Sequence, residues 1–383
     1  MWVPSGASLS TPTDGAPVPS DSTLVMPEAA AAPALVIQTA FLGDVVLTTP
    51  LLETLARRHG PVDVVTTPTA APLLETHPAV RQVIAYDKRG KDRGLRKLVA
   101  LARRLRAERY AAAYLPHRSL RTAGLAWLAR IRRRVGFHGA WPLLYTDVRR
   151  RAETGHEIDR LLALAGDPAL TGGPALTGGP ALTGGAMPSM PSLEIPVPDR
   201  ATTEGFLREH GIREPFVALA PGSIWGSKRW PYYGELAEQL AARGGIVVVG
   251  GPEDATLASE ITAAVGRSGG RAVSSCGRLT VRQAAEVIRR AVVLVTNDSA
   301  PLHFAQAVGT PTVAVFGPTV PAFGFGPRGP RDQVVELDGL ACRPCSTHGP
   351  RRCPLGHHLC MKSLTVEDVL KAIEATGALH RRD

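Results

Sequence analysis

The chain has 383 residues, of which 44% are hydrophobic and 20% charged, ordinary values for a globular protein that can bury a core. Because domains average roughly 150 residues, this length predicts two folded units with connecting material. The excess of 44 Lys and Arg over 34 Asp and Glu, a formal charge of +10, favours anionic partners: nucleic acid, a membrane surface or a phosphorylated substrate.

Several protein classes do not fit this sequence. No run approaches the ~20 apolar residues that span a bilayer, and the amino terminus lacks a basic stretch followed by an apolar core. Five cysteines in a chain of this size do not indicate a disulfide framework. The basic segment carries no interleaved aromatic residues and no finger, helix-turn-helix or RNA-binding signature, so nucleic acid is not an expected partner. We expect a cytoplasmic protein.

Two segments are of low complexity. Residues 1–33 are rich in Ser, Thr, Pro, Gly and Ala without periodicity, which predicts a disordered leader. Residues 167–192 contain three copies of P-A-L-T-G-G, and two glycines in each copy favour a linker over a stacked β-solenoid. The remaining segments, 34–166 and 193–383, are the two expected domains.

Short apolar runs alternate with helical patterns through residues 34–166. A helix is expected after Gly43 through Arg58, and another at Leu95–Ala107, where apolar residues recur every three or four positions. The expected strands are Ala34–Gln38, Val62–Thr66, Gln82–Tyr86, Ala111–Leu115 and Arg134–Phe137. This alternation predicts a parallel sheet covered by helices.

The second half repeats the arrangement. Its expected strands are Phe216–Ala220, Ile246–Val249, Val292–Thr296 and Thr312–Phe316, and each ends in small or polar residues. Ligands of open α/β sheets bind outside the carboxyl ends of the strands, so these loops should line one crevice. The predicted fold class is α/β, with two doubly wound Rossmann-like domains facing across a cleft.

The loop after the first expected strand reads Phe41-Leu42-Gly43-Asp44. One glycine cannot form the three-glycine dinucleotide fingerprint, which disfavours a hydride-transferring Rossmann enzyme. Asp44 lies at a strand-to-helix turn, where an aspartate either caps the helix or performs chemistry. The residues alone leave both interpretations open.

Three further strand-end segments have the composition of a nucleotide site. Residues 221–231 combine hydroxyls, backbone donors and Lys228, which suits a diphosphate, although a solvated basic loop would look the same. Residues 297–303 begin a helix whose amino terminus can stabilise a leaving diphosphate, or can simply be capped by Asp298 or Ser299. Glu253 is placed to accept hydrogen bonds from a ribose, or to favour its own helix through the dipole.

Together these segments resemble glycosyltransferase family nine, the ADP-heptose:lipopolysaccharide heptosyltransferases, from Ala34 to about Ile373. The most specific motifs are F-L-G-D-V-V-L-T-T-P at 41–50, P-G-S-x-W-x-x-K-R-W-P at 221–231 and N-D-S-A-P-L-H at 297–303. A fourth is the cysteine segment, which is most similar to the heptosyltransferase II branch. The resemblance implies a GT-B fold.

The resemblance also implies roles. Asp44 matches the general base that takes the proton of the acceptor hydroxyl, and Lys228 matches the lysine that contacts the diphosphate and assists catalysis. The other implied donor-binding residues are Ser223, Glu253, Asp298, Ser299, Ala300 and His303. On the acceptor side we expect Gly43, Arg118 and Arg121, although a solvated charged face would account for most arginines of this basic half.

The implied reaction is transfer of heptose, with inversion, from ADP-L-glycero-D-manno-heptose to the inner-core heptose of lipopolysaccharide. The acceptor is a phosphorylated, Kdo-bearing lipid A glycolipid, so the outer arginines are expected to meet the anionic inner membrane peripherally. The alternatives are a family-nine transferase with another donor or acceptor, such as heptosyltransferase I, and a GT-B sugar-nucleotide epimerase.

No cofactor is expected for this reaction, because Lys228 and a helix terminus can stabilise the leaving charge. Four cysteines nevertheless have a spacing that fits a tetrahedral zinc site: Cys342, Cys345, Cys353 and Cys360. Since the resemblance implies no catalytic metal, a structural loop is favoured over a zinc site.

Overall fold

The computed structural model describes residues 32–139, 141–166 and 189–380. The expected leader lies almost wholly outside these ranges, and so do the three P-A-L-T-G-G repeats. Among the described residues, a helix with the length and hydrophobicity of a membrane span is absent.

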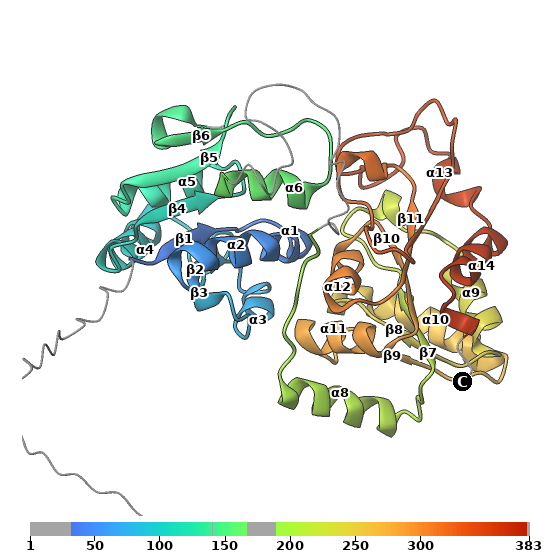
Figure 1. Ribbon diagram of the computed structural model, residues 1–383. Coiled ribbons are helices and arrows are strands. Elements are labelled where there is room, and N and C mark those ends of the chain that lie inside the picture. Colours follow the sequence, from blue (N-terminus) through green and yellow to red (C-terminus); the bar gives the residue numbers. More distant parts are fainter. Residues whose placement is uncertain (1–31, 140, 167–188, 381–383) are drawn as a thin grey trace, which may run out of the picture. The chain divides into compact units, whose positions relative to one another are not determined.

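The first half forms a parallel six-stranded sheet in the order β3-β2-β1-β4-β5-β6 (Figure 1). Its strands are β1 (Ala34–Ile37), β2 (Val62–Thr66), β3 (Val80–Ala85), β4 (Ala112–Leu115), β5 (Arg133–Phe137) and β6 (Asp147–Arg149). Its helices and short 3₁₀ turns are α1 (Leu42–Leu47), α2 (Thr49–His59), α3 (Ala71–Leu74), α4 (Leu95–Ala107), α5 (Leu120–Leu128), η1 (Pro142–Leu144), α6 (Glu157–Leu162) and η2 (Ala163–Ala165).

The second half forms another parallel six-stranded sheet, in the order β12-β11-β10-β7-β8-β9. Its strands are β7 (Phe216–Ala220), β8 (Gly245–Val248), β9 (Ala272–Ser274), β10 (Val293–Asn297), β11 (Thr312–Phe316) and β12 (Gln333–Glu336). The longer helices are α8 (Val197–Glu209), α9 (Tyr233–Ala241), α10 (Ala255–Arg267), α11 (Val281–Arg290), α12 (Ala300–Val308) and α14 (Val366–Ala375). The shorter elements are η3 (Gly226–Lys228), η4 (Pro252–Asp254), η5 (Pro321–Phe323), α13 (Leu359–Lys362) and η6 (Ala378–His380).

The two sheets have the same topology. In each, the first strand of the half pairs with both the second and the fourth, as β1 pairs with β2 and β4. This is the doubly wound order, which creates a switch point where neighbouring loops diverge. The switch points lie between β1 and β4 and between β7 and β10, so the α/β, doubly wound fold class is confirmed.

Burial explains which strands the sequence revealed. β1, β2, β4, β7, β10 and β11 are buried at every position, as expected for inner strands covered by helices on both faces. The strands that sequence analysis missed are the edge strands β6, β9 and β12, which have three or four residues and are partly exposed. The helix expected through Arg58 is two helices, because Pro50 begins a new first turn after Thr48.

A buried carboxylate interrupts the apolar run of β2. Asp63 is fully buried and accepts two hydrogen bonds from Arg81, at 2.7 Å from Nε and 2.6 Å from Nη2. The hydroxyl of Tyr110 donates to Asp63 Oδ2 at 2.6 Å. Arg81 belongs to β3 and Tyr110 precedes β4, so this network joins segments around β2.

Asp63 is fully buried, so removing its partner Arg81, whose side chain is partly exposed, leaves an uncompensated buried charge. We therefore expect Arg81→Ala to lower the free energy of unfolding by about 3 kcal/mol, measured by urea denaturation. Arg133→Ala is the matched control, because Arg133 is about as exposed as Arg81 while its partner Asp147, 3.2 Å away, still reaches solvent, so this pair should contribute less than about 1 kcal/mol. Equal losses for the two variants would contradict the structural role of the network.

Candidate functional site

Asp44 lies in the first turn of α1, directly after the loop that leaves β1. Its Oδ2 accepts a hydrogen bond from the backbone N–H of Phe41 at 3.1 Å, so the side chain does cap its own helix. Burial raises the pKa of Asp44 to about 6, although the Phe41 hydrogen bond opposes this shift. A carboxylate with a pKa near neutrality is suited to accept a proton, so cap and base are compatible roles.

Gly43 allows α1 to lie against α12. A Cβ at residue 43 would lie only 2.6 Å from Cδ2 of His303 and 3.7 Å from the Cα of Ala300. His303 is buried, its Nδ1 pairs with Gln306 Oε1 at 3.0 Å, and burial lowers its pKa. Because Asp44 follows Gly43 in the chain, this close approach places Asp44 near the start of α12.

The amino terminus of α12 has no side-chain cap. Ser299 occupies the N-cap position in an extended conformation, but its side chain makes no capping hydrogen bond to the helix. Its hydroxyl lies instead 3.4 Å from the carbonyl oxygen of Asn297. Free N–H groups and the positive end of the helix dipole form an anion site, and a diphosphate is the type of anion that such a site accepts.

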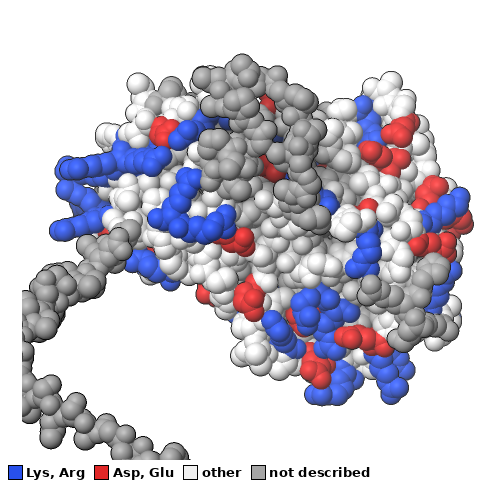
Figure 2. Space-filling model, in the orientation of Figure 1, with Lys and Arg blue, Asp and Glu red and all other residues white. Residues whose placement is uncertain are grey.

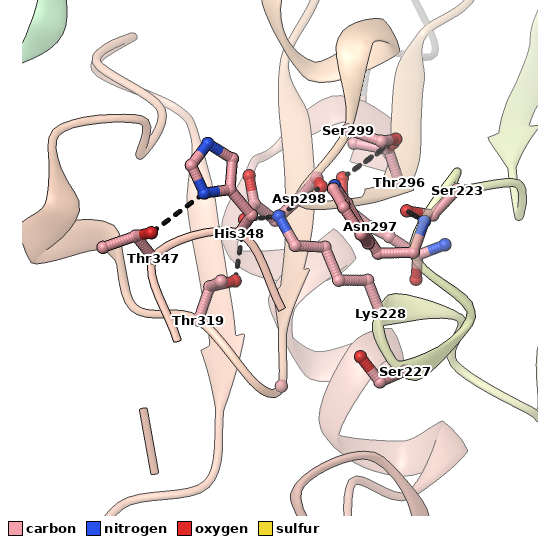
Figure 3. A network of polar contacts seen from close by, with 12 residues as sticks. Ser223, Ser227, Lys228, Thr296, Asn297, Asp298, Ser299, Thr319, Thr347 and His348 are labelled. Carbon is pink, nitrogen blue, oxygen red and sulfur yellow. Dashed lines mark hydrogen bonds and ion pairs between the residues drawn. The ribbon is translucent and has the colours of Figure 1, made fainter. Parts of the chain in front are cut away.

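Lys228 lies beside this helix start, as Figure 3 shows. Its Nζ is 2.5 Å from Oδ2 of Asp298 and 3.3 Å from the carbonyl oxygen of the same residue. The hydroxyl of Thr319 donates to the same Oδ2 at 2.7 Å. Both charged side chains are about nine-tenths buried, so the pair is largely removed from water and its orientation is fixed.

Asn297 fixes the loop that carries Lys228. Its side-chain N–H donates to the carbonyl of Pro221 at 2.8 Å, and its Oδ1 accepts from the backbone of Trp230 at 3.2 Å. Trp230 is buried in the core, so it packs and is not free to stack on a base. The Ser223 hydroxyl accepts from the backbone of Trp225 at 3.2 Å, which places it in the same loop.

The cysteine segment, residues 342–360, packs on the Lys228 loop. A Cβ at Gly349 would lie 3.2 Å from Cε of Lys228, so the aliphatic stem of the lysine runs directly over this glycine. The Ser227 hydroxyl donates to the carbonyl of Pro350, and His358 donates from Nε2 to the carbonyl of Ser227 at 2.7 Å. The segment therefore supports the lysine on one side.

The four cysteines of this segment are free thiols. Cys342 Sγ lies 3.9 Å from Nε2 of His357, and Cys345 Sγ lies 3.4 Å from the carbonyl of Cys342. Burial raises the pKa of Cys360 to about 11, and the neighbouring thiols add to the effect. In the described part of the chain, no group of three or more His, Cys, Asp or Glu side chains is arranged to hold a metal ion.

The segment after β8 carries two acids with different surroundings. Glu253 is exposed, with its carboxylate folded over Gly251. Asp254 is buried, accepts from the backbone of Gly251 at 3.1 Å and lies 3.7 Å from Arg229. Asp254 thus helps to fix the loops after β7 and β8, a role that its sequence context did not reveal.

Cations gather at the carboxyl ends of β1, β3 and β4. Arg118 is exposed, whereas Arg121 donates to the Tyr86 hydroxyl at 2.7 Å and stacks over that ring. Lys88 donates to the carbonyl of Thr39 at 2.7 Å, and burial lowers the pKa of its ammonium group. Sequence analysis missed Lys88, because it follows a partly exposed strand and belongs to none of the motifs.

Two other charged side chains that were not singled out act on Asp44. Glu157 raises the pKa of Asp44 and Arg151 lowers it, and the two form an ion pair with each other. Arg160 lies 3.3 Å from Glu157 and donates to the carbonyl of Phe323 at 2.8 Å. The start of α6 therefore adjusts the field at Asp44 and binds the η5 turn.

Comparison with known proteins shows which family this chain resembles. The sequence profile of glycosyltransferase family 9 (heptosyltransferase) matches residues 98–354. Lipopolysaccharide heptosyltransferase 2 of Escherichia coli strain K12 is 28% identical over 366 residues, which cover 89% of this chain and 97% of that protein. Lipooligosaccharide heptosyltransferase 2 of Campylobacter jejuni is 32% identical over 162 residues, and this match spans only 50% of its length.

A solved structure agrees with the sequence match. The structure of E. coli ADP-heptose lps heptosyltransferase II has 27% sequence identity and a TM-score of 0.72, covering 91% of this chain and 99% of that chain. The GT-B expectation and the expectation of a glycosyltransferase are thereby confirmed. The family assignment leaves the epimerase alternative without support. Because the profile covers about two thirds of the sequence, the chain belongs to glycosyltransferase family 9, the heptosyltransferase family.

Proposed function

We propose that this enzyme transfers heptose from ADP-L-glycero-D-manno-heptose to a heptose on the inner core of lipopolysaccharide, with inversion at the anomeric carbon. The observation that carries the proposal is the close approach of Gly43 to His303, which brings Asp44 beside the uncapped start of α12. A proton acceptor and a diphosphate-binding site in this proximity suit a displacement at a carbon between them. The similarity to heptosyltransferases named for lipopolysaccharide supports the sugar and the acceptor.

The reaction proceeds in one displacement. Asp44 takes the proton of the acceptor hydroxyl while that oxygen forms a bond to the anomeric carbon, and the bond from this carbon to the diphosphate oxygen breaks. The backbone N–H groups of Ser299 and Ala300 and the ammonium of Lys228 stabilise the negative charge on the leaving ADP. No metal ion is needed for this step, because these groups supply the positive charge.

Asp298 and Ser223 complete the donor side. The carboxylate of Asp298, held by Thr319, fixes the Lys228 ammonium within reach of the diphosphate and can accept a hydrogen bond from the heptose. Ser223 contributes a hydroxyl from the facing loop. Glu253 is exposed and free to bind the ribose, and His303 supports the α12 start through its packing against Gly43.

The acceptor side is the basic cluster on the first sheet. Lys88, Arg118 and Arg121 lie at the carboxyl ends of β3 and β4, where they can bind the phosphate and Kdo carboxylate groups of the glycolipid. Because that acceptor is anchored by lipid A, we infer that the enzyme works at the cytoplasmic face of the inner membrane as a peripheral protein.

The proposal is tested by product analysis. With ADP-heptose and two defined acceptors, one ending in Kdo and one ending in heptose, we expect mass spectrometry to find one added heptose only on the heptose-terminated acceptor. Transfer to the Kdo-terminated acceptor instead would assign first-heptose transfer. Release of ADP without any glycosylated product would exclude the proposed transfer altogether.

A substitution can remove the proposed base function of Asp44 and keep its capping hydrogen bond. Asp44→Asn keeps an oxygen that can accept from the Phe41 N–H but cannot take a proton, so we expect turnover to fall by about 10²–10⁴-fold with little change in ADP affinity. Asp368→Asn is the matched control, because Asp368 accepts the same type of hydrogen bond from Thr365 in α14. Near-normal turnover of Asp44→Asn would remove the base from the mechanism.

The same assignment predicts a pH dependence. Because the pKa of Asp44 is raised to about 6, the carboxylate is ionised above that pH and becomes protonated below it. We expect the turnover rate of the wild type to be level above pH 6 and to fall about tenfold for each unit below it. The residual activity of Asp44→Asn should lack this acid limb.

Lys228→Ala should weaken binding of ADP as well as turnover. A hydrogen bond to a charged group contributes about 1.5–3 kcal/mol, so calorimetry should find ADP bound roughly 10- to 100-fold more weakly. In Lys228→Ala the carboxylate of Asp298 loses its partner and can repel ADP. The double variant Lys228→Ala/Asp298→Asn removes this negative charge, so any gain in ADP affinity over Lys228→Ala measures the repulsion. An unchanged dissociation constant in both variants would refute contact between Lys228 and the diphosphate.

A further inference from the structure

Helix α4 presents a row of cations that the proposed chemistry does not use. Its thirteen residues contain no acid, and one face packs into the core through Ala102 and Leu105. The rest of the α4 surface carries five exposed cations: Arg96, Lys97, Arg103, Arg104 and Arg106. Among the described residues, none of the five forms an ion pair, so their charge is not neutralised within the structure.

Large apolar side chains are exposed on the elements beside α4. Helix α5 contacts α4 and the η1 turn contacts α5. Leu120 and Trp127 are seven residues apart on α5, which places them on one helix face, and Trp127 is 53% exposed. Leu143 in η1 is 94% exposed, and Trp141 before it is also exposed. Four exposed large apolar side chains on α5 and the η1 region, two elements that contact each other, are candidates for an interaction site.

Figure 2 shows Lys and Arg side chains gathered on the part of the first half that carries α4 in Figure 1, with neutral surface between them. Cations interspersed with Trp and Leu are typical of a surface that enters the headgroup region of an anionic bilayer. A nucleic acid would use the cations but would give Leu143 no partner. A second copy of the chain would bring like charges together.

We propose that α4, the outer face of α5 and η1, named here the α4–α5 surface, dock on a bilayer that contains anionic lipids. The proposal rests on the proposed function in one respect, namely that a lipid-anchored acceptor gives the enzyme a reason to bind membrane. Leu120 stands between Arg118 and Arg121 in sequence, so this surface adjoins the cations assigned to the acceptor. A docked enzyme would therefore meet the sugar part of a glycolipid whose lipid part stays in the bilayer.

The contribution of charge can be measured by sedimentation of the full chain with phosphatidylcholine vesicles, prepared with and without phosphatidylglycerol. Each cation near an anionic surface contributes about 1 kcal/mol, a factor of about five, so Arg103→Gln/Arg104→Gln/Arg106→Gln should weaken partitioning by about a hundredfold. The control Arg208→Gln/Arg243→Gln/Arg267→Gln loses the same charge from exposed positions of the second half and should partition as the wild type.

The apolar side chains distinguish a membrane from other polyanions. Trp127→Ser/Leu143→Ser should weaken vesicle binding by tenfold or more and leave binding to duplex DNA unchanged. Val197→Ser/Val334→Ser, a control pair of exposed apolar residues in the second half, should have no effect. Wild-type vesicle binding by Trp127→Ser/Leu143→Ser would overturn the proposal and leave a general polyanion surface.

Activity on a soluble acceptor separates the two proposals. All of these variants should keep the turnover of the wild type on a delipidated, water-soluble acceptor, and their thermal unfolding should match that of the wild type. If the wild-type enzyme fails to bind anionic vesicles while it transfers heptose normally, the docking surface and the peripheral location are wrong, and the proposed heptose transfer stands. If it binds vesicles but transfers no heptose, the reverse holds.

Discussion

The close contact between α1 and α12 is the constraint on which the site depends. Any side chain at residue 43 would meet the ring of His303, so only a glycine allows the two helices to approach this closely. Asp44 follows Gly43 in the chain, and burial raises the pKa of its carboxyl to about 6. One contact between distant segments therefore brings the turn that carries this carboxylate close to the start of α12.

The second feature is the confinement of Lys228. Its ammonium pairs with Asp298, its stem lies over Gly349, and the preceding carbonyl accepts from His358. A flexible lysine loses considerable side-chain entropy when it binds a diphosphate, and a lysine that is already held loses less. The cysteine segment thus supports the loop that carries Lys228.

The Lys and Arg side chains of the first half differ in how firmly the fold holds them. Two groups of cations in the first half differ in their surroundings: a partly buried group at strand ends, which includes Lys88 and Arg121, and an exposed group on α4. The first group is held by hydrogen bonds to Thr39 and Tyr86, which gives it fixed geometry suited to a defined anion. The second group is unpaired among the described residues, and such charges act through the field they create at a surface.

The sequence alone was enough to identify the inner strands and the loops at their carboxyl ends. Continuous apolar runs identified the inner strands, because a parallel sheet covered on both faces tolerates little else, and the small or polar residues at their ends located the loops of the site. These loops carry Asp44, Lys228 and Asp298, to which the family resemblance assigns roles. Edge strands such as β12 were missed, since they are short and half exposed and carry no distinctive pattern.

The tertiary structure decided which of these residues meet. The sequence around Asp44 left open whether this residue caps a helix or acts as a base. The fold shows the cap, and burial raises the pKa of the carboxyl to about 6, which suits the proposed base. Lys88, Glu157 and His358 gained their roles only through contacts across the fold. Local sequence fixes hydrogen-bonding groups and hydrophobic periodicity, whereas proximity and desolvation arise only when distant segments pack together.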